Sequence, residues 1–357
     1  MLESSELDSN VWRMIPSGPV LGDSFPTLSD SPSDPLGELV QEEPTPACVV
    51  PPPLVSGDLL CVISPSGGLQ PSEKFEQGLN IWRERGYRVH LCEGYNDRWG
   101  YLAGQDERRR QQLTSALNNP EYKAILCSRG GYGGTRLLED WTWPPASEAQ
   151  PPKWLIGFSD ITSLLWSQAR LGISGVHGPV LTTLADEPNK SQTRLFEWVE
   201  QHTIAPIEGK GWSALGCGGS TTGVLLPGNL CVATHLLGTA AEPSLTNVIL
   251  AFEDVGEAPY RLDRMLTQWR SMGKLQQIRG IALGRFSGWE PEPSKPTLSV
   301  DTVMRDRLSD LDIPIVSDLP FGHDGENAAL PVGLPVKLDA DAGTLSWPTL
   351  SVNQLLV

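Results

Sequence analysis

Short apolar runs alternate with stretches of helical periodicity along most of the chain. Apolar runs closed by turn residues are typical of buried strands, and apolar residues three and four positions apart are typical of helices. Strands following helices in this way predict a parallel sheet covered by helices on both faces. In the first half we expect strands within Gly57–Gly67, Tyr87–Glu93, Tyr122–Ser128 and Lys153–Ser159, and helices within Pro71–Arg85 and Asp106–Leu117.

A second block with the same alternation follows a polar, tryptophan-containing stretch. Its expected elements are strands within Asn247–Asp254, Ile278–Phe286 and Ile313–Pro320, helices within Tyr260–Ser271 and Val300–Leu311, and a hairpin around Asp341–Gly343. The predicted fold class is therefore α/β. We expect an N-terminal parallel-sheet domain of the Rossmann or flavodoxin type at 56–180, a linker at 181–219, and a C-terminal α/β domain at 220–357.

The N-terminal end of the chain has a different composition. Residues 1–57 hold nine acidic residues against the single base Arg13, and ten of the 31 prolines of the chain. Such a segment buries too little apolar surface to offset its ordering entropy, so we predict a disordered acidic tail at 1–55. It lacks the basic start and apolar run of a secretory signal, and the sequence contains no apolar run long enough for a membrane span.

The charge and the cysteines of the chain argue against three kinds of protein: nucleic-acid-binding, disulfide-bonded and metal-binding. The formal net charge of −16 over 357 residues argues against a nucleic-acid partner, which requires clustered Lys and Arg. The six cysteines are scattered without CxxC spacing, so we expect buried free thiols and a cytoplasmic protein. The absence of an HExxH motif and of a Cys/His cluster argues against a metal site.

A serine stands at a predicted strand-to-helix corner in KWLIGFSDITSLLW, Lys153–Trp166. At the carboxyl end of a strand, Ser159 would be exposed where open α/β sheets bind ligands, and the following N–H groups could hold an oxyanion. The alternative is that Ser159 or Asp160 only caps the helix. The second glycine of a G-x-S-x-G elbow is missing. The local sequence leaves both interpretations open.

A glycine cluster, CSRGGYGGTR at Cys127–Arg136, also follows a strand. It matches neither the dinucleotide fingerprint, whose third glycine is replaced by Arg136, nor a P-loop. Its backbone amides could form a wall beside a reaction centre, or the cluster could be only a tight turn.

Two further residues suit acid–base chemistry. His323 lies on a glycine-flanked loop after a strand, which suits proton transfer, although an ordinary surface histidine is equally consistent. Glu253 ends a strand, where it could orient an imidazole; alternatively, Glu253 or Glu257 pairs with Arg261 or Arg264 in a structural ion pair. His177 is interpreted as a packed histidine.

Six motifs in order and spacing resemble those of one family. They are LCSRGGYGGTRLL, LIGFSDITSLLW, GVHGPV, LPGNL, ILAFEDVGEAPYRLDRML and LPFGHDGENAALPVG, between Gly57 and Trp347. The chain resembles the L,D-carboxypeptidases of murein tetrapeptides, a family that also contains the microcin C immunity peptidases. The acidic tail and about Asp186–Gly219 do not match.

The resemblance implies a Ser–Glu–His catalytic triad, which motif matching places on Ser159, Glu253 and His323. It also implies an oxyanion hole formed by backbone amides. Those amides map to Asp160 and to Gly130 or Gly131, of which we favour Gly131. By the same matching, Arg129, Tyr132 and Asn229 are candidates for substrate binding. The active site is expected in a cleft between the two domains.

The expected function is removal of the terminal D-Ala from murein tetrapeptides during peptidoglycan recycling. No cofactor, metal, nucleic acid or membrane is implied, and the family's tendency implies a homodimer. Cleavage of a peptidyl-nucleotide antibiotic, or of another small acyl-amide, is the alternative within the family. An inactive muropeptide-binding protein is a third hypothesis.

Overall fold

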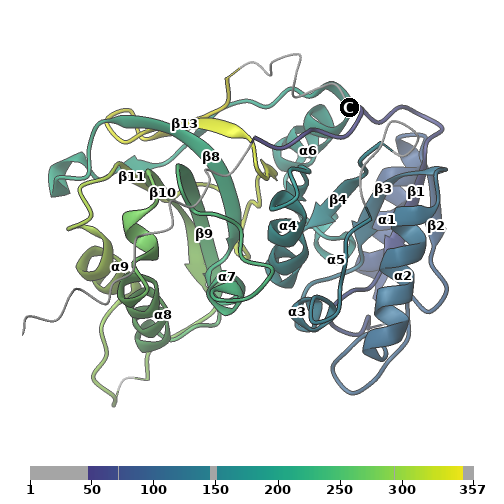
Figure 1. The fold of residues 1–357 in the computed structure, drawn as a ribbon, viewed down its shortest axis with the longest axis horizontal. Coiled ribbons are helices and arrows are strands. Elements are labelled where there is room, and N and C mark those ends of the chain that lie inside the picture. Colours follow the sequence, from purple (N-terminus) through teal and green to yellow (C-terminus); the bar gives the residue numbers. More distant parts are fainter. Residues whose placement is uncertain (1–46, 71, 145–150, 293, 349–357) are drawn as a thin grey trace, which may run out of the picture. The chain divides into compact units, whose positions relative to one another are not determined.

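The first sheet of the protein is largely parallel. The computed structural model describes residues 47–70, 72–144, 151–292 and 294–348, which all belong to one compact unit, Glu42–Val357. The order of strands is β12-β5-β4-β3-β1-β2, and the pairing is parallel except between β12 and β5. Figure 1 labels four of these neighbouring strands, β4, β3, β1 and β2. The strands are β1 (Leu59–Ile63), β2 (Arg88–Leu91), β3 (Tyr122–Cys127), β4 (Trp154–Gly157), β5 (Val176–His177) and β12 (Leu330–Pro331).

The helices of this half differ in how much of their surface is buried: α1 buries one apolar face, whereas every residue of α4 is buried. In α1, Phe75, Leu79 and Trp82 recur at helical spacing and are buried, and Ser72 caps the helix by accepting from the N–H of Lys74. The predicted strands and helices of the first half are confirmed. The helices are α1 (Glu73–Glu84), α2 (Asp106–Asn118), α3 (Gly134–Leu137), α4 (Thr162–Ala169), α5 (Leu181–Leu184) and α6 (Asn189–Gln201).

The second sheet is mixed, with the order β6-β14-β13-β8-β9-β10-β11-β7. Its parallel centre is β8 (Ser220–Asn229), β9 (Val248–Val255), β10 (Gly280–Ser287) and β11 (Ile315–Ser317). Antiparallel strands flank it: β6 (Ile207–Glu208), β7 (Lys210–Gly211), β13 (Pro335–Asp339) and β14 (Thr344–Ser346). Its helices are α7 (Leu230–Leu236), α8 (Pro259–Ser271) and α9 (Val300–Leu308).

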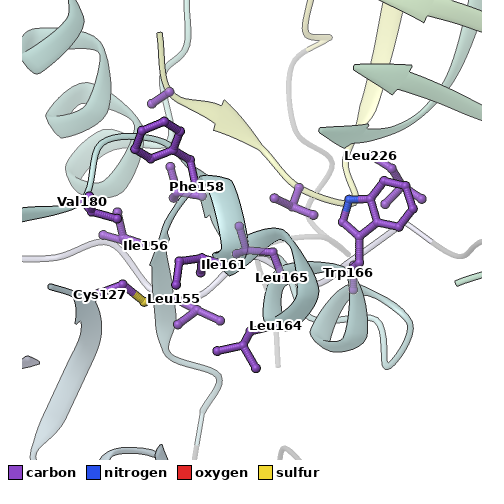
Figure 2. Packing of buried hydrophobic residues seen from close by; sticks show 14 of the residues in the cluster. Cys127, Leu155, Ile156, Phe158, Ile161, Leu164, Leu165, Trp166, Val180 and Leu226 are labelled. Carbon is purple, nitrogen blue, oxygen red and sulfur yellow. The ribbon is translucent and has the colours of Figure 1, made fainter. Parts of the chain in front are cut away.

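The two sheets share a hydrophobic core. Trp166 of α4 is fully buried, lies beside Leu226 of β8, and donates its indole N–H to the carbonyl of Pro227 at 2.8 Å (Figure 2). Its ring also lies against Phe252 of β9 and Trp269 of α8, with centroids 6.4 and 6.5 Å apart. Helix α4, which begins just after the candidate nucleophile Ser159, is therefore packed against the second sheet.

Two segments differ from the predicted organisation. Residues 1–46 lie outside the described part of the chain, but Cys48, Val50 and Leu54 of the predicted tail are buried in the core. These apolar side chains stand in a proline-rich stretch, and a prediction from the average composition of residues 1–55 does not detect single buried positions. The predicted linker at 181–219 contains helix α6, whose buried face includes Leu195 and Trp198, and the short strands β6 and β7 of the second sheet.

Candidate active site

Ser159 occupies an unusual backbone conformation directly after β4. Its φ of 62° lies in the left-handed region, which residues with a Cβ seldom adopt. Ser159–Ile161 then forms a 3₁₀ turn that leads into α4. A backbone held in a sparsely populated region persists where the surrounding structure imposes it, commonly at functional sites. The corner therefore resembles a nucleophile elbow although one glycine of the elbow motif is missing.

Neither Ser159 nor Asp160 acts as a helix cap. The N-cap positions of the 3₁₀ turn and of α4 make no side-chain capping hydrogen bond. The buried carboxylate of Asp160 instead accepts the N–H of Gly134 at 2.7 Å. Burial raises the pKa of Asp160, and hydrogen bonds such as the one from Gly134 oppose that rise. Asp160 thus fastens the glycine loop to the serine corner.

The glycine loop lies directly against the serine. A Cβ at Gly130 would come within 2.9 Å of Cβ and 3.1 Å of Oγ of Ser159, so only glycine fits without displacing the hydroxyl. Gly131 follows with a φ of 114°, in the region that favours glycine. The buried guanidinium of Arg109 holds the loop by donating to the carbonyl of Gly133 at 2.8 Å. Backbone amides are thereby brought near the serine.

Glu253 and His323 form a hydrogen-bonded pair across 70 residues of sequence. Nδ1 of His323 lies 2.6 Å from Oε2 of Glu253, and since a carboxylate can only accept, the imidazole carries its proton on Nδ1. Glu253 is fully buried at the end of β9, whereas the side chain of His323 is 18% exposed. Nε2 of the imidazole is then the acceptor, as a general base requires.

The imidazole also lies beside the serine corner. The rings of His323 and Phe158, the residue before Ser159, have centroids 4.6 Å apart. Among the described residues the Ser159 hydroxyl makes no hydrogen bond to His323. The structure therefore joins Glu253 directly to His323 and places their pair against the neighbour of Ser159. Of the ion pairs expected as alternatives here, the one between Glu257 and Arg261 is present at 3.5 Å, while Glu253 pairs with His323.

The three candidates for substrate binding differ in environment. Asn229 is only 4% exposed; its amide donates to Asp254 at 2.9 Å and its carbonyl oxygen caps α7 through Val232. These hydrogen bonds fix the position of the Asn229 side chain at the start of α7. Arg129 is half-buried at the serine corner. Tyr132 is 49% exposed, and its ring lies 5.8 Å from that of Tyr101.

Two further residues lie near the pair: Arg285, which the sequence did not indicate, and His177, which the sequence predicts to be packed. Arg285 of β10 donates to the carbonyl of Glu326 at 2.9 Å and also to that of Asp324, and so fixes the loop that carries His323. His177 is confirmed as a packed histidine: it is fully buried, and burial lowers its pKa to about 4. The contacts of Arg285 join segments that lie far apart in the sequence, so they could not be predicted from the local sequence.

The described residues contain no group of three His, Cys, Asp or Glu side chains placed to hold a metal ion. Across the same part of the chain, no helix combines the length and apolar character needed to cross a membrane.

Comparisons with known proteins agree on one family. Residues 60–178 match the family model of the LD-carboxypeptidase N-terminal domain, and residues 222–338 match that of the LD-carboxypeptidase C-terminal domain. A Synechocystis protein whose name assigns it provisionally to the carboxypeptidases is 54% identical over 83% of this chain and 96% of its own length. The murein tetrapeptide carboxypeptidase of Pseudomonas aeruginosa is 31% identical over 81% and 94%.

Solved structures show the same fold. The muramoyltetrapeptide carboxypeptidase from Oxalobacter formigenes superposes with a TM-score of 0.71 at 29% identity, covering 82% of this chain and all of that one. The microcin C7 self-immunity protein MccF is similar in fold, with a TM-score of 0.73 at 19% identity over 86% of this chain and 100% of that one. The family expected from the six ordered motifs is confirmed, and this chain belongs to the LD-carboxypeptidases, a family of peptidases.

Proposed function

We propose that the protein is a serine-type L,D-carboxypeptidase that removes the terminal D-Ala from murein tetrapeptides. The observation that carries the proposal is the Glu253–His323 hydrogen bond beside a serine in a left-handed turn. This combination supplies the orienting carboxylate, the imidazole and the nucleophile that acyl transfer requires.

In the proposed mechanism Ser159 attacks the carbonyl between an L-centre and the terminal D-residue. His323 accepts the serine proton on Nε2 and delivers it to the leaving amine. Water then attacks the acyl-enzyme and gives a proton to Nε2 of His323, which returns it to Ser159 as the shortened peptide leaves. Glu253 holds the imidazole in the productive tautomer and stabilises its charged form. The N–H groups of Asp160 and Gly131 stabilise the oxyanion. The ring of Phe158, the neighbour of Ser159, contacts His323, and we propose that the serine–histidine hydrogen bond forms when substrate binds, as catalytic hydrogen bonds often do.

The cellular setting is a proposal as well. Among the described residues all six cysteines are free, and five of them are buried, which supports a reducing compartment such as the cytoplasm. A cytoplasmic enzyme of this specificity would act in peptidoglycan recycling. The family's tendency also suggests a homodimer, which light scattering of the purified protein would test.

Two synthetic substrates test the proposed reaction. The purified protein is incubated with a murein tetrapeptide ending in D-Ala and with the same peptide ending in L-Ala, and the released alanine is quantified. We expect release from the D-Ala peptide only. Equal cleavage of both peptides, or cleavage of neither, contradicts the proposal. A peptidyl-nucleotide amide in parallel tests the alternative activity that the fold of MccF suggests, and cleavage of that amide alone would favour it.

A further inference from the structure

The guanidinium of Arg129 lies against Gly67, Gly68 and Gly131, next to the loop that contacts Ser159. Arg129 directly precedes Gly130, which touches Ser159, and its side chain folds back over the neighbouring loops. A Cβ at Gly67 would lie 3.4 Å from its Nε, and a Cβ at Gly131 would lie 3.7 Å from its Nη2. The cation therefore sits beside the amide that we propose for the oxyanion hole.

No acidic side chain within the described ranges pairs with Arg129. Among the residues that the structure describes, its side chain makes one hydrogen bond, from Nη1 to the carbonyl of Gly68 at 3.1 Å, so most of the five N–H donors of the guanidinium have no partner there. Arg109 and Arg136, from the same region, both bond to Asp106. A half-buried guanidinium without an acidic partner is an electrostatic site for an anion.

The buried acids of the site are already engaged with other groups. Asp160 accepts from Gly134 and Glu253 from His323, so neither neutralises Arg129. Their negative charges, in a chain of net charge −16, would oppose the approach of an anionic substrate. The cation beside Gly131 would offset that repulsion at one position.

A carboxypeptidase must distinguish a terminal residue, with its free carboxylate, from an internal one. A guanidinium suits this task because its planar fork matches a carboxylate with two parallel hydrogen bonds. We infer that Arg129 binds the terminal carboxylate of the substrate and restricts cleavage to the last residue. This inference rests on the proposed function and identifies the specificity determinant of the same site.

The test compares two peptides that differ only at this group. One is a murein tetrapeptide ending in D-Ala as the free acid, and the other is its C-terminal carboxamide. The ratio of kcat/KM for acid over amide is measured for the wild type, Arg129→Met, Arg129→Lys and the control Arg98→Met. Arg98 is an exposed arginine whose Cγ would lie 3.4 Å from a Cβ at Gly68. Because the ratio is taken within one variant, it does not depend on the fraction of folded enzyme.

We expect the wild type and Arg98→Met to prefer the acid by about tenfold to a hundredfold, the contribution of a charge-assisted bidentate pair. Arg129→Met should have a ratio near one, mainly through a higher KM for the acid, and Arg129→Lys should lie between. If Arg129 only clamps the Gly68 loop, both peptides lose activity equally in Arg129→Met and the ratio is unchanged, which overturns the inference. Equal cleavage of acid and amide by the wild type also overturns it while leaving the proposed function intact.

Discussion

The left-handed backbone of Ser159 directs its hydroxyl toward the glycine loop, and Gly130 leaves the space for it. Gly130 lies too close to Ser159 for any larger residue, since a Cβ at position 130 would lie 2.9 Å from Cβ of the serine. The position of the Ser159 hydroxyl therefore depends on the absence of a side chain at Gly130.

Substituting Gly130→Ala should displace the hydroxyl and lower kcat/KM at least about tenfold, because small misplacements of reacting groups are costly in rate. Kinetics with the D-Ala tetrapeptide and a thermal melt check this prediction. A variant that retains activity within twofold of the wild type would show that the loop does not constrain the nucleophile.

His177 should make the stability of the protein sensitive to pH. Burial lowers its pKa to about 4 in the folded state, with smaller and opposed effects of Glu253 and His323. In the unfolded chain the pKa is about 6.5. Between these values the unfolded state binds a proton that the folded state does not, so the free energy of unfolding falls as the pH drops through this window.

The expected loss from this group between pH 7.5 and pH 5 is about 2 kcal/mol. Urea denaturation at both pH values, for the wild type and for His177→Leu, measures it. The variant should lose correspondingly less stability on acidification. Identical pH dependence in both proteins would mean that His177 is protonated without cost in the folded state.

Residues close in sequence could be identified from motifs, but their geometry could not. Ser159 and the glycine cluster were recognisable from their position after strands. The left-handed φ of Ser159, the anchoring of Asp160 on Gly134 and the burial of Asn229 depend on packing between distant segments. The alternatives of a helix cap and of an Arg261 ion pair could be decided only by those contacts.

At the scale of elements, long apolar strands and amphipathic helices were predictable and short or mixed ones were not. The central strand β8 was missed because its first half is only partly buried and it contains Gly223 and Pro227, residues that disfavour strands. β5 and β12 have two residues each and are defined by pairing with distant strands, β5 with β4 and β12 with β5. No periodicity exists over such a length.

The segment before β1 should contribute to stability as a packed element. Leu54 is 2% exposed and its N–H donates to Val199 of α6 at 2.8 Å, whereas the neighbouring Val55 is 61% exposed. We expect Leu54→Ala to lower the free energy of unfolding by about 2–4 kcal/mol, as for other buried leucines. Val55→Ala is the matched control, with an expected change within about 0.5 kcal/mol. Urea denaturation compares the two, and equal small effects would contradict the packing.

At the scale of the whole molecule, the two family domains share one core. The contacts of Trp166 with Phe252 and Trp269 connect α4 to the second sheet, and β12, which lies beyond β11 in sequence, completes the first. The catalytic candidates are divided in the same way, since Ser159 follows β4 while Glu253 belongs to β9. Activity is therefore expected to require both halves folded together.

Such coupling predicts a single unfolding transition despite two family domains. Far-UV circular dichroism and tryptophan fluorescence should give coincident midpoints in urea, with activity lost in the same range. Two separated transitions would show that the halves fold independently and that the shared core contributes little.

The proposed nucleophile, Ser159, is tested most directly by the release of D-Ala from a murein tetrapeptide by Ser159→Ala. Ser115→Ala, at an exposed serine of α2, is the matched control. We expect Ser159→Ala to keep the thermal stability of the wild type but less than about one hundredth of its kcat/KM, because the covalent route is lost. The control should retain full activity. Turnover by Ser159→Ala above that level would show that Ser159 is not the nucleophile.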